Sequence, residues 1–166
     1  MFKHIDFPTS DWQIRQSWNR LIRIIQEDVE HKRVTNTSGG AMVKGDIVYV
    51  EDSDRNVDLA VNDTEVHADW VAVMAEPAAD GETGIARTEG YALVHFTAAS
   101  VLANQEGLPV YVSATAGQAT IVAPDDPDFT SHVGILGDAT EFDGATNPFA
   151  WVFLRNSCGI GDPVPQ

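Results

Sequence analysis

The first thirty residues place apolar side chains with the period of an α-helix. Six of them lie within an arc of about 100° when successive residues are set 100° apart, which is the width of one buried stripe. Pro8 and the capping pair Ser10 and Gln13 indicate a helix start. We therefore predict an amphipathic helix after Ser10, with arginines on its polar side. The apolar stripe consists of Ile14, Trp18, Leu21, Ile22, Ile25 and Val29.

After about residue 33 the helical period is replaced by short apolar runs between turn-forming clusters such as Asp52-Ser53-Asp54 and Asp143-Gly144. This pattern predicts a mainly β fold, a small antiparallel β-barrel or sandwich of about 8–9 short strands, preceded by the N-terminal amphipathic helix. The strands are expected near residues 45–51, 57–61, 70–75, 84–87, 91–96, 109–113, 119–123, 132–137 and 149–155.

A weak internal repeat connects the two halves of this β region. Gly45 with Val48-Tyr49-Val50 recurs 62 residues later as Gly107 with Val110-Tyr111-Val112. Residues 71–75 match residues 133–137 at the same offset. Strand residues also match by coincidence, so chance alternation is the alternative explanation. The constant offset favours two related β-meanders that together close one small barrel.

Charge is divided unevenly along the chain. The net charge is −15, yet residues 1–44 carry seven basic and five acidic side chains, whereas residues 45–166 carry three basic and twenty acidic ones. Phosphate backbones repel so acidic a chain, so no nucleic-acid partner is expected. We predict an N-terminal arm and helix over 1–34 for docking or oligomerisation, a β domain over 35–156 and a flexible C-terminal tail over 157–166.

The residue types that usually carry catalysis do not form a catalytic pattern. Cys158 is the single cysteine, the five histidines lack metal-ligand spacing, and neither a phosphate-binding glycine loop nor a nucleophile elbow is present. We therefore predict a protein that is not an enzyme and has no catalytic residues and no cofactor. No apolar run reaches the length of a membrane span, and the first residues lack the apolar core of a secretion signal, so no membrane partner is expected.

Two acidic segments leave calcium binding open. Asp52, Asp54, Asn56 and Asp58 alternate like the start of a calcium loop, but Val57 stands where such a loop needs glycine. The cluster Asp125–Asp128 is similarly acidic. A solvated polar connection is the simpler interpretation of both segments, and spacing does not separate it from calcium binding.

Several runs resemble the small β domains of structural proteins from tailed bacteriophages. They are the segment from Thr37 to Val50, the segment from Gly107 to Gly117, and the runs His132–Leu136 and Trp151–Leu154. The resemblance covers about residues 35–156 and concerns strand-turn-strand patterns. Such domains occur in capsid decoration (cement) proteins and in the heads of phage fibres, commonly as homotrimers. The resemblance implies no catalytic residues.

These observations predict a non-enzymatic virion protein that decorates or cements the outer surface of a phage capsid as a homotrimer. It would be synthesised in the bacterial host cytoplasm, and its partners would be further copies of itself and the major capsid protein. The alternative is a fibre or adhesin module that binds host carbohydrate, for which Trp70 and Trp151 are candidate stacking residues, although core or subunit packing is their simpler role. The expected subunit or capsid interface consists of Phe2, Phe7, Trp12, Ile14, Trp18, Leu21, Ile22, Ile25 and Val29.

Overall fold

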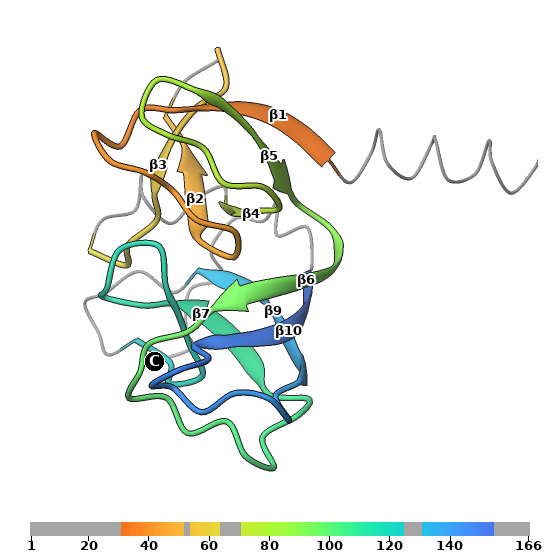
Figure 1. The fold of residues 1–166 in the computed structure, drawn as a ribbon. Helices are drawn as coiled ribbons and strands as arrows, with labels where there is room; N and C mark the ends of the chain where they lie inside the picture. The colour runs from red at the N-terminus through yellow and green to blue at the C-terminus, as the bar shows by residue number, and fades with distance from the viewer. Residues whose placement is uncertain (1–30, 52–53, 64–70, 125–130, 155–166) are drawn as a thin grey trace, which may run out of the picture.

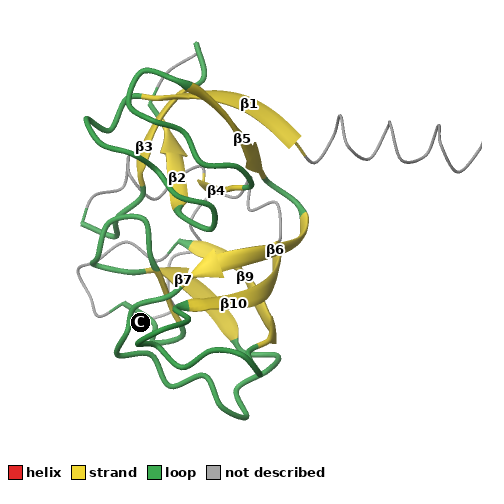
Figure 2. Cartoon of the chain, viewed as in Figure 1, coloured by secondary structure: helices red, strands yellow, loops and turns green. Residues whose placement is uncertain are grey.

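The computed structural model describes residues 31–51, 54–63, 71–124 and 131–154, and all of its regular structure there is β (Figures 1 and 2). The N-terminal helix expected from the sequence lies outside these described residues. The strands are β1 (His31–Asn36), β2 (Ile47–Val50), β3 (Asn56–Leu59), β4 (Val71–Met74), β5 (Thr83–Arg87), β6 (Gly90–His95), β7 (Pro109–Val112), β8 (Ala119–Thr120), β9 (His132–Asp138) and β10 (Phe149–Leu154).

The first five strands form a closed barrel in the order β1-β3-β2-β4-β5. Closure depends on β1, which pairs antiparallel with β5 and parallel with β3. Alternate residues of these strands point inward, as the two-residue period of a strand requires. A small core of buried apolar residues fills the barrel: Val34, Met42, Val48, Val57, Ala72, Met74, Ala78 and Ala86.

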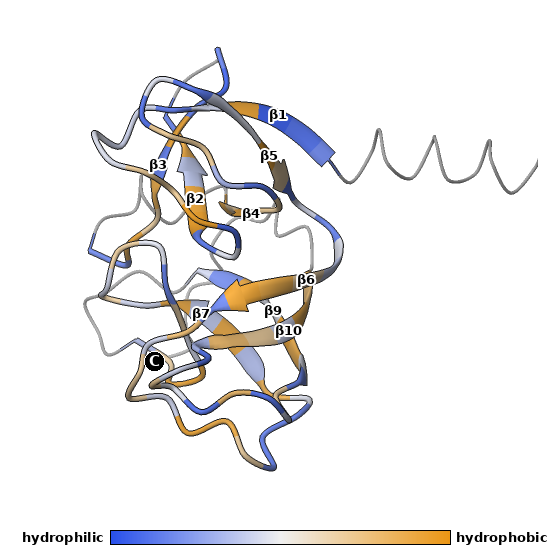
Figure 3. Cartoon of the chain, in the orientation of Figure 1, coloured by the Kyte–Doolittle hydropathy of each residue, from blue (hydrophilic) through white to orange (hydrophobic). Residues whose placement is uncertain are grey.

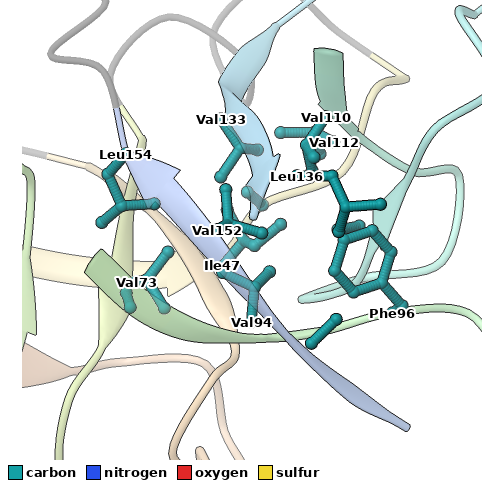
Figure 4. Packing of buried hydrophobic residues seen from close by; sticks show 14 of the residues in the cluster. Ile47, Val73, Val94, Phe96, Val110, Val112, Val133, Leu136, Val152 and Leu154 are labelled. Carbon is teal, nitrogen blue, oxygen red and sulfur yellow. The ribbon is translucent and has the colours of Figure 1, made fainter. Parts of the chain in front are cut away.

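The last five strands form a second sheet in the order β6-β10-β9-β7-β8. A parallel bridge between Phe96 and Ala119 brings its two edge strands together. A larger core lies beneath this sheet, and it includes Ile47 and Val73 from the barrel as well as Val94 and Val152 from the sheet (Figure 4). The barrel and the second sheet therefore share one continuous hydrophobic core.

The second sheet repeats the barrel strand by strand. β7 pairs with β8 and β9 as β2 pairs with β3 and β4, and the register agrees at the offset of 62 residues. The pair Tyr49↔Asp58 corresponds to Tyr111↔Thr120. The parallel bridge at Ala119 corresponds to the contact between β1 and β3 in the barrel. The internal repeat is thus a repeat of topology, not a chance alternation of apolar residues.

Turns repeat as well as strands. The Gly45 N–H donates to the Met74 carbonyl at 2.8 Å, and the equivalent Gly107 N–H donates to the Leu136 carbonyl at 2.8 Å. Both glycines have positive φ, 96° and 88°, which a residue with a side chain rarely adopts. The same left-handed turn therefore leads into β2 and into β7.

Two expectations from the sequence are corrected. The repeats do not combine to close one barrel, because each repeat gains a strand of its own, β1 or β6, and forms a separate five-stranded sheet. In addition, β1 was not expected, and its residues 31–34 pair with β5 although they were placed in the N-terminal arm. The nine expected strands are all present, with β8 reduced to two residues.

Candidate functional site

The outer surface of the second sheet carries large apolar side chains that the core does not use. Tyr91 of β6 is 53% exposed, and Trp151 and Phe153 of β10 are 44% and 46% exposed. Leu93 and Ile135, which are half-buried, lie opposite Trp151 and Phe153 in the strand register. We call these five residues the aromatic face.

The side chains of the aromatic face pack against one another. Tyr91 lies opposite Phe153, and their rings meet edge to face with centroids 5.5 Å apart. Gly137 of β9 leaves room for the tyrosine, because a β-carbon at position 137 would lie 2.8 Å from Tyr91 Cε1. The rings are therefore held in place by their neighbours in the absence of any partner molecule.

The equivalent surface of the barrel is polar. The register matches the pair Tyr91↔Phe153 with His31↔Arg87, because Ile135 beside Phe153 corresponds to Val73 beside Arg87. Figure 3 shows the difference, with a hydrophilic start to β1 and a hydrophobic β6. Since the barrel folds with polar residues at these positions, the strand topology does not require aromatic side chains there. Exposed apolar patches of this kind usually mark interaction surfaces.

Arg87 connects the start of β1 to the edge of the aromatic face. Its Nη1 donates to the carbonyl oxygen of Tyr91, and its Nε donates to Nε2 of His31 at 3.1 Å. The chain therefore enters the barrel beside the edge of the aromatic face, which fixes where residues 1–30 join the folded part.

A second polar cluster joins the barrel to the second sheet. Asp46, just before β2, accepts a hydrogen bond from His95 Nδ1 at 2.9 Å and another from the Val43 N–H at 2.8 Å. The side chains of His95 and Asp46 are only 20% and 10% exposed. The other ring nitrogen of His95 lies 3.4 Å from the Gln118 amide nitrogen. No hydroxyl or thiol nucleophile is among these contacts, so the cluster bridges the two sheets.

Side-chain capping accounts for the remaining polar clusters with perturbed titration. In the loop before β10, the Asn147 backbone N–H and the Thr146 hydroxyl lower the pKa of Asp143. The hydroxyl of Thr140 likewise lowers the pKa of Asp138. Burial is the main cause that raises the pKa of Tyr49. Asp138 and Asp143 are exposed and hold turns, and neither is grouped with other potential metal ligands.

The predicted interface residues are all in the first thirty positions. Phe2, Phe7, Trp12 and the apolar stripe from Ile14 to Val29 therefore lie outside the described residues, and their role stays a prediction. Trp70 and Cys158 also lie outside them. Trp151 is described, and its position on the outer surface corrects the expectation of core packing, leaving subunit packing or sugar stacking.

The acidic segments show no metal site in the part of the chain that is described. Asp54 precedes β3 and Asp58 lies in it, whereas Asp52 and the cluster Asp125–Asp128 lie outside the described residues. Across residues 31–51, 54–63, 71–124 and 131–154, no three His, Cys, Asp or Glu side chains group closely enough to hold a metal ion. Those same ranges contain no helix that is long and apolar enough to span a membrane.

Sequence reasoning missed the aromatic face, although the run Phe149–Leu154 carried a signal for it. That run alternates small residues, Ala150 and Val152, with the large rings Trp151 and Phe153. The small residues are buried and the rings are exposed. In the comparisons with known proteins, no family model matches the chain, and no curated protein matches it.

Proposed function

We propose that the protein is a non-enzymatic structural component of a tailed-phage virion. It decorates or cements the outer surface of the capsid as a homotrimer, binds the major capsid protein, and is made in the cytoplasm of the bacterial host. The observation that carries the proposal is the aromatic face: an exposed, preorganised apolar surface at positions where the equivalent strands of the barrel are polar. Such a surface suits protein assembly.

The resemblance to phage β domains supports the virion assignment. Its first two segments contain β2 and β7, which are equivalent strands of the repeat, and the other two fall in β9 and β10. The strong negative charge after residue 44 suits a β domain that faces solvent on a crowded particle surface. The N-terminal region, with its smaller net charge, would contact the shell or neighbouring subunits.

The size of the aromatic face indicates how much of an interface it supplies. Full burial of the exposed parts of Tyr91, Trp151 and Phe153 would remove roughly 300 Å² of apolar surface, worth up to about 8 kcal/mol. A stable protein interface buries about 1,200–2,000 Å² in total. The three rings are thus the centre of an interface, and further contacts, such as the N-terminal stripe, must supply the rest.

Co-sedimentation with capsids that lack decoration tests the proposal. The full-length protein should pellet with the capsids at hundreds of copies per particle and saturate at a fixed ratio to the major capsid protein. An acidic protein of similar size is the control for trapping. Absence of binding, or a copy number typical of a tail fibre, would contradict a capsid decoration role.

The exposed rings also favour a second candidate, a fibre or adhesin module that binds host carbohydrate. Trp151 and Tyr91 offer flat surfaces on which sugar rings stack. A glycan array separates the two candidates, because a fibre module should bind a defined glycan and lose that binding when Trp151 is replaced by alanine. A decoration protein should bind no glycan on the array and should bind the capsid.

A further inference from the structure

We propose that the aromatic face of each subunit is covered by the N-terminal apolar stripe of a neighbouring copy. The stripe comprises Ile14, Trp18, Leu21, Ile22, Ile25 and Val29. This inference rests on the proposed homotrimer and specifies the contact that holds it together. Each subunit gives its stripe to one neighbour and receives a stripe from the other, so the contacts are head-to-tail and close into a ring.

The position where the chain enters the fold supports this occupant. β1 begins at His31, and Arg87 joins the His31 ring to the Tyr91 carbonyl at the edge of the aromatic face. The thirty preceding residues therefore leave the folded part next to this surface. In a ring of copies, the stripe of one subunit starts close to the aromatic faces around it.

The dimensions of the stripe and the face agree. From Ile14 to Val29 a helix would rise about 22 Å, with a diameter of about 10 Å. The six residues of β10 span about 20 Å, and β6, β10 and β9 lie side by side over about 10 Å. One helix thus covers the aromatic face along its length and across its three strands.

Charge also favours the stripe over another apolar segment. Its flanks carry Arg15, Arg20 and Arg23. The acidic side chain of Asp138, on β9, lies opposite Trp151 in the register at the border of the aromatic face. Basic flanks therefore meet an acidic border when the apolar surfaces are in contact.

Chain connectivity favours a neighbouring copy over the same subunit. β1 and β6 run in the same direction across Figure 1, so a helix that precedes β1 would have to fold back to lie along its own β6. The stripe ends at Val29 and β1 begins at His31, which leaves only Glu30 for that reversal. Connections between helices and strands usually need about 2–6 residues. A neighbour's aromatic face can be reached without reversal.

Two full-length variants test the proposal by complementation. The face variant carries Tyr91→His, Leu93→Arg and Phe153→Arg, which are the residues that the barrel has at the equivalent positions His31, Arg33 and Arg87. The stripe variant carries Trp18→Asp and Leu21→Asp. Each alone should be an 18.0 kDa monomer, with a dissociation constant raised on the order of 100-fold or more. Their equimolar mixture should form a two-chain complex, because one intact stripe meets one intact face.

A matched control uses exposed valines outside the aromatic face. Val101 and Val122 are 72% and 71% exposed, and Val101→Arg with Val122→Arg should leave the trimer intact. A cysteine experiment gives an answer even if the face variant does not fold. In a Cys158→Ser background, a Trp18→Cys chain and a Phe153→Cys chain should form a disulfide-linked pair when mixed, and neither chain should do so alone.

The possible outcomes separate this inference from the proposed function. A trimeric face variant, or a mixture of variants that stays monomeric, would overturn the exchanged stripe while leaving capsid decoration standing. A disulfide formed within one chain that carries both Trp18→Cys and Phe153→Cys would show that the stripe covers its own subunit, which also overturns the proposal. A monomeric wild-type protein would overturn both this inference and the proposed homotrimer.

Discussion

Replacement of Asp46 by alanine should weaken the connection between the barrel and the second sheet. The Asp46 carboxylate accepts hydrogen bonds from His95 Nδ1, on β6, and from the Val43 N–H, within the barrel. The substitution removes both bonds and leaves the largely buried His95 ring without its acceptor. Because one core extends through both sheets, we expect the whole β region to lose stability in a single transition.

The size of the loss follows from the exposure of each donor. A hydrogen bond to a charged group in a buried setting contributes about 1.5–3 kcal/mol. Val43 is 45% exposed, so water can replace the lost acceptor of its N–H, and the bond to His95 dominates. We expect a decrease of about 2 kcal/mol in the free energy of unfolding, which in urea corresponds to a midpoint lower by about 1 M.

Urea denaturation monitored by circular dichroism measures this loss, with Asp80→Ala as the matched control. Asp80 also accepts one backbone hydrogen bond, from the Gly39 N–H at 3.0 Å, but on the exposed surface, so its replacement should cost less than about 0.5 kcal/mol. A double-mutant cycle with His95→Ala should give a coupling of about 1 kcal/mol. Equal losses for the two aspartates, or a coupling near zero, would refute the assigned bridge.

Two further predictions concern the second sheet and its loops. Gly134→Ala should lower the free energy of unfolding by about 1–3 kcal/mol, because its β-carbon would lie 2.3 Å from the Phe153 carbonyl oxygen; Gly40→Ala, into open space, is the control for a thermal melt. The Asn147 N–H lowers the pKa of Asp143 below its ordinary value of 3.8, so the loop is stabilised above that pH and loses this stabilisation as the pH falls through the lowered pKa. An NMR titration should show Asp143 still ionised at pH 3, and protonation near pH 4 would contradict the capping.

The sequence predicted the strands well because their punctuation and their repeat are local signals. The match of Val48-Tyr49-Val50 with Val110-Tyr111-Val112 corresponds to real equivalence, since both segments pair with their neighbours in the same register. The number of sheets was not predictable from that match. The strands that complete each sheet, β1 and β6, do not share the offset of 62 residues, because the loops that follow them differ in length.

Strand β1 and the aromatic face were missed for opposite reasons. β1 begins with His31-Lys32-Arg33, and only Val34 and Asn36 are buried, so a closed barrel has imposed strand structure on a mostly polar segment. Strand β10 is apolar at every position from Phe149 to Leu154, so alternation does not show which residues face outward. Only the packing of β10 between β6 and β9 assigns Trp151 and Phe153 to the surface.

An electron cryomicroscopy map of the assembled particle tests the central claim most directly, namely that this protein binds the outside of a capsid and assembles through its aromatic face. We predict density for the tandem β fold in groups of three on the outer surface of the shell. Within each group, a rod of density from a neighbouring subunit should lie over Tyr91, Trp151 and Phe153. Density for the fold only at the tail fibres, or on the shell with these three side chains open to solvent, would contradict the claim.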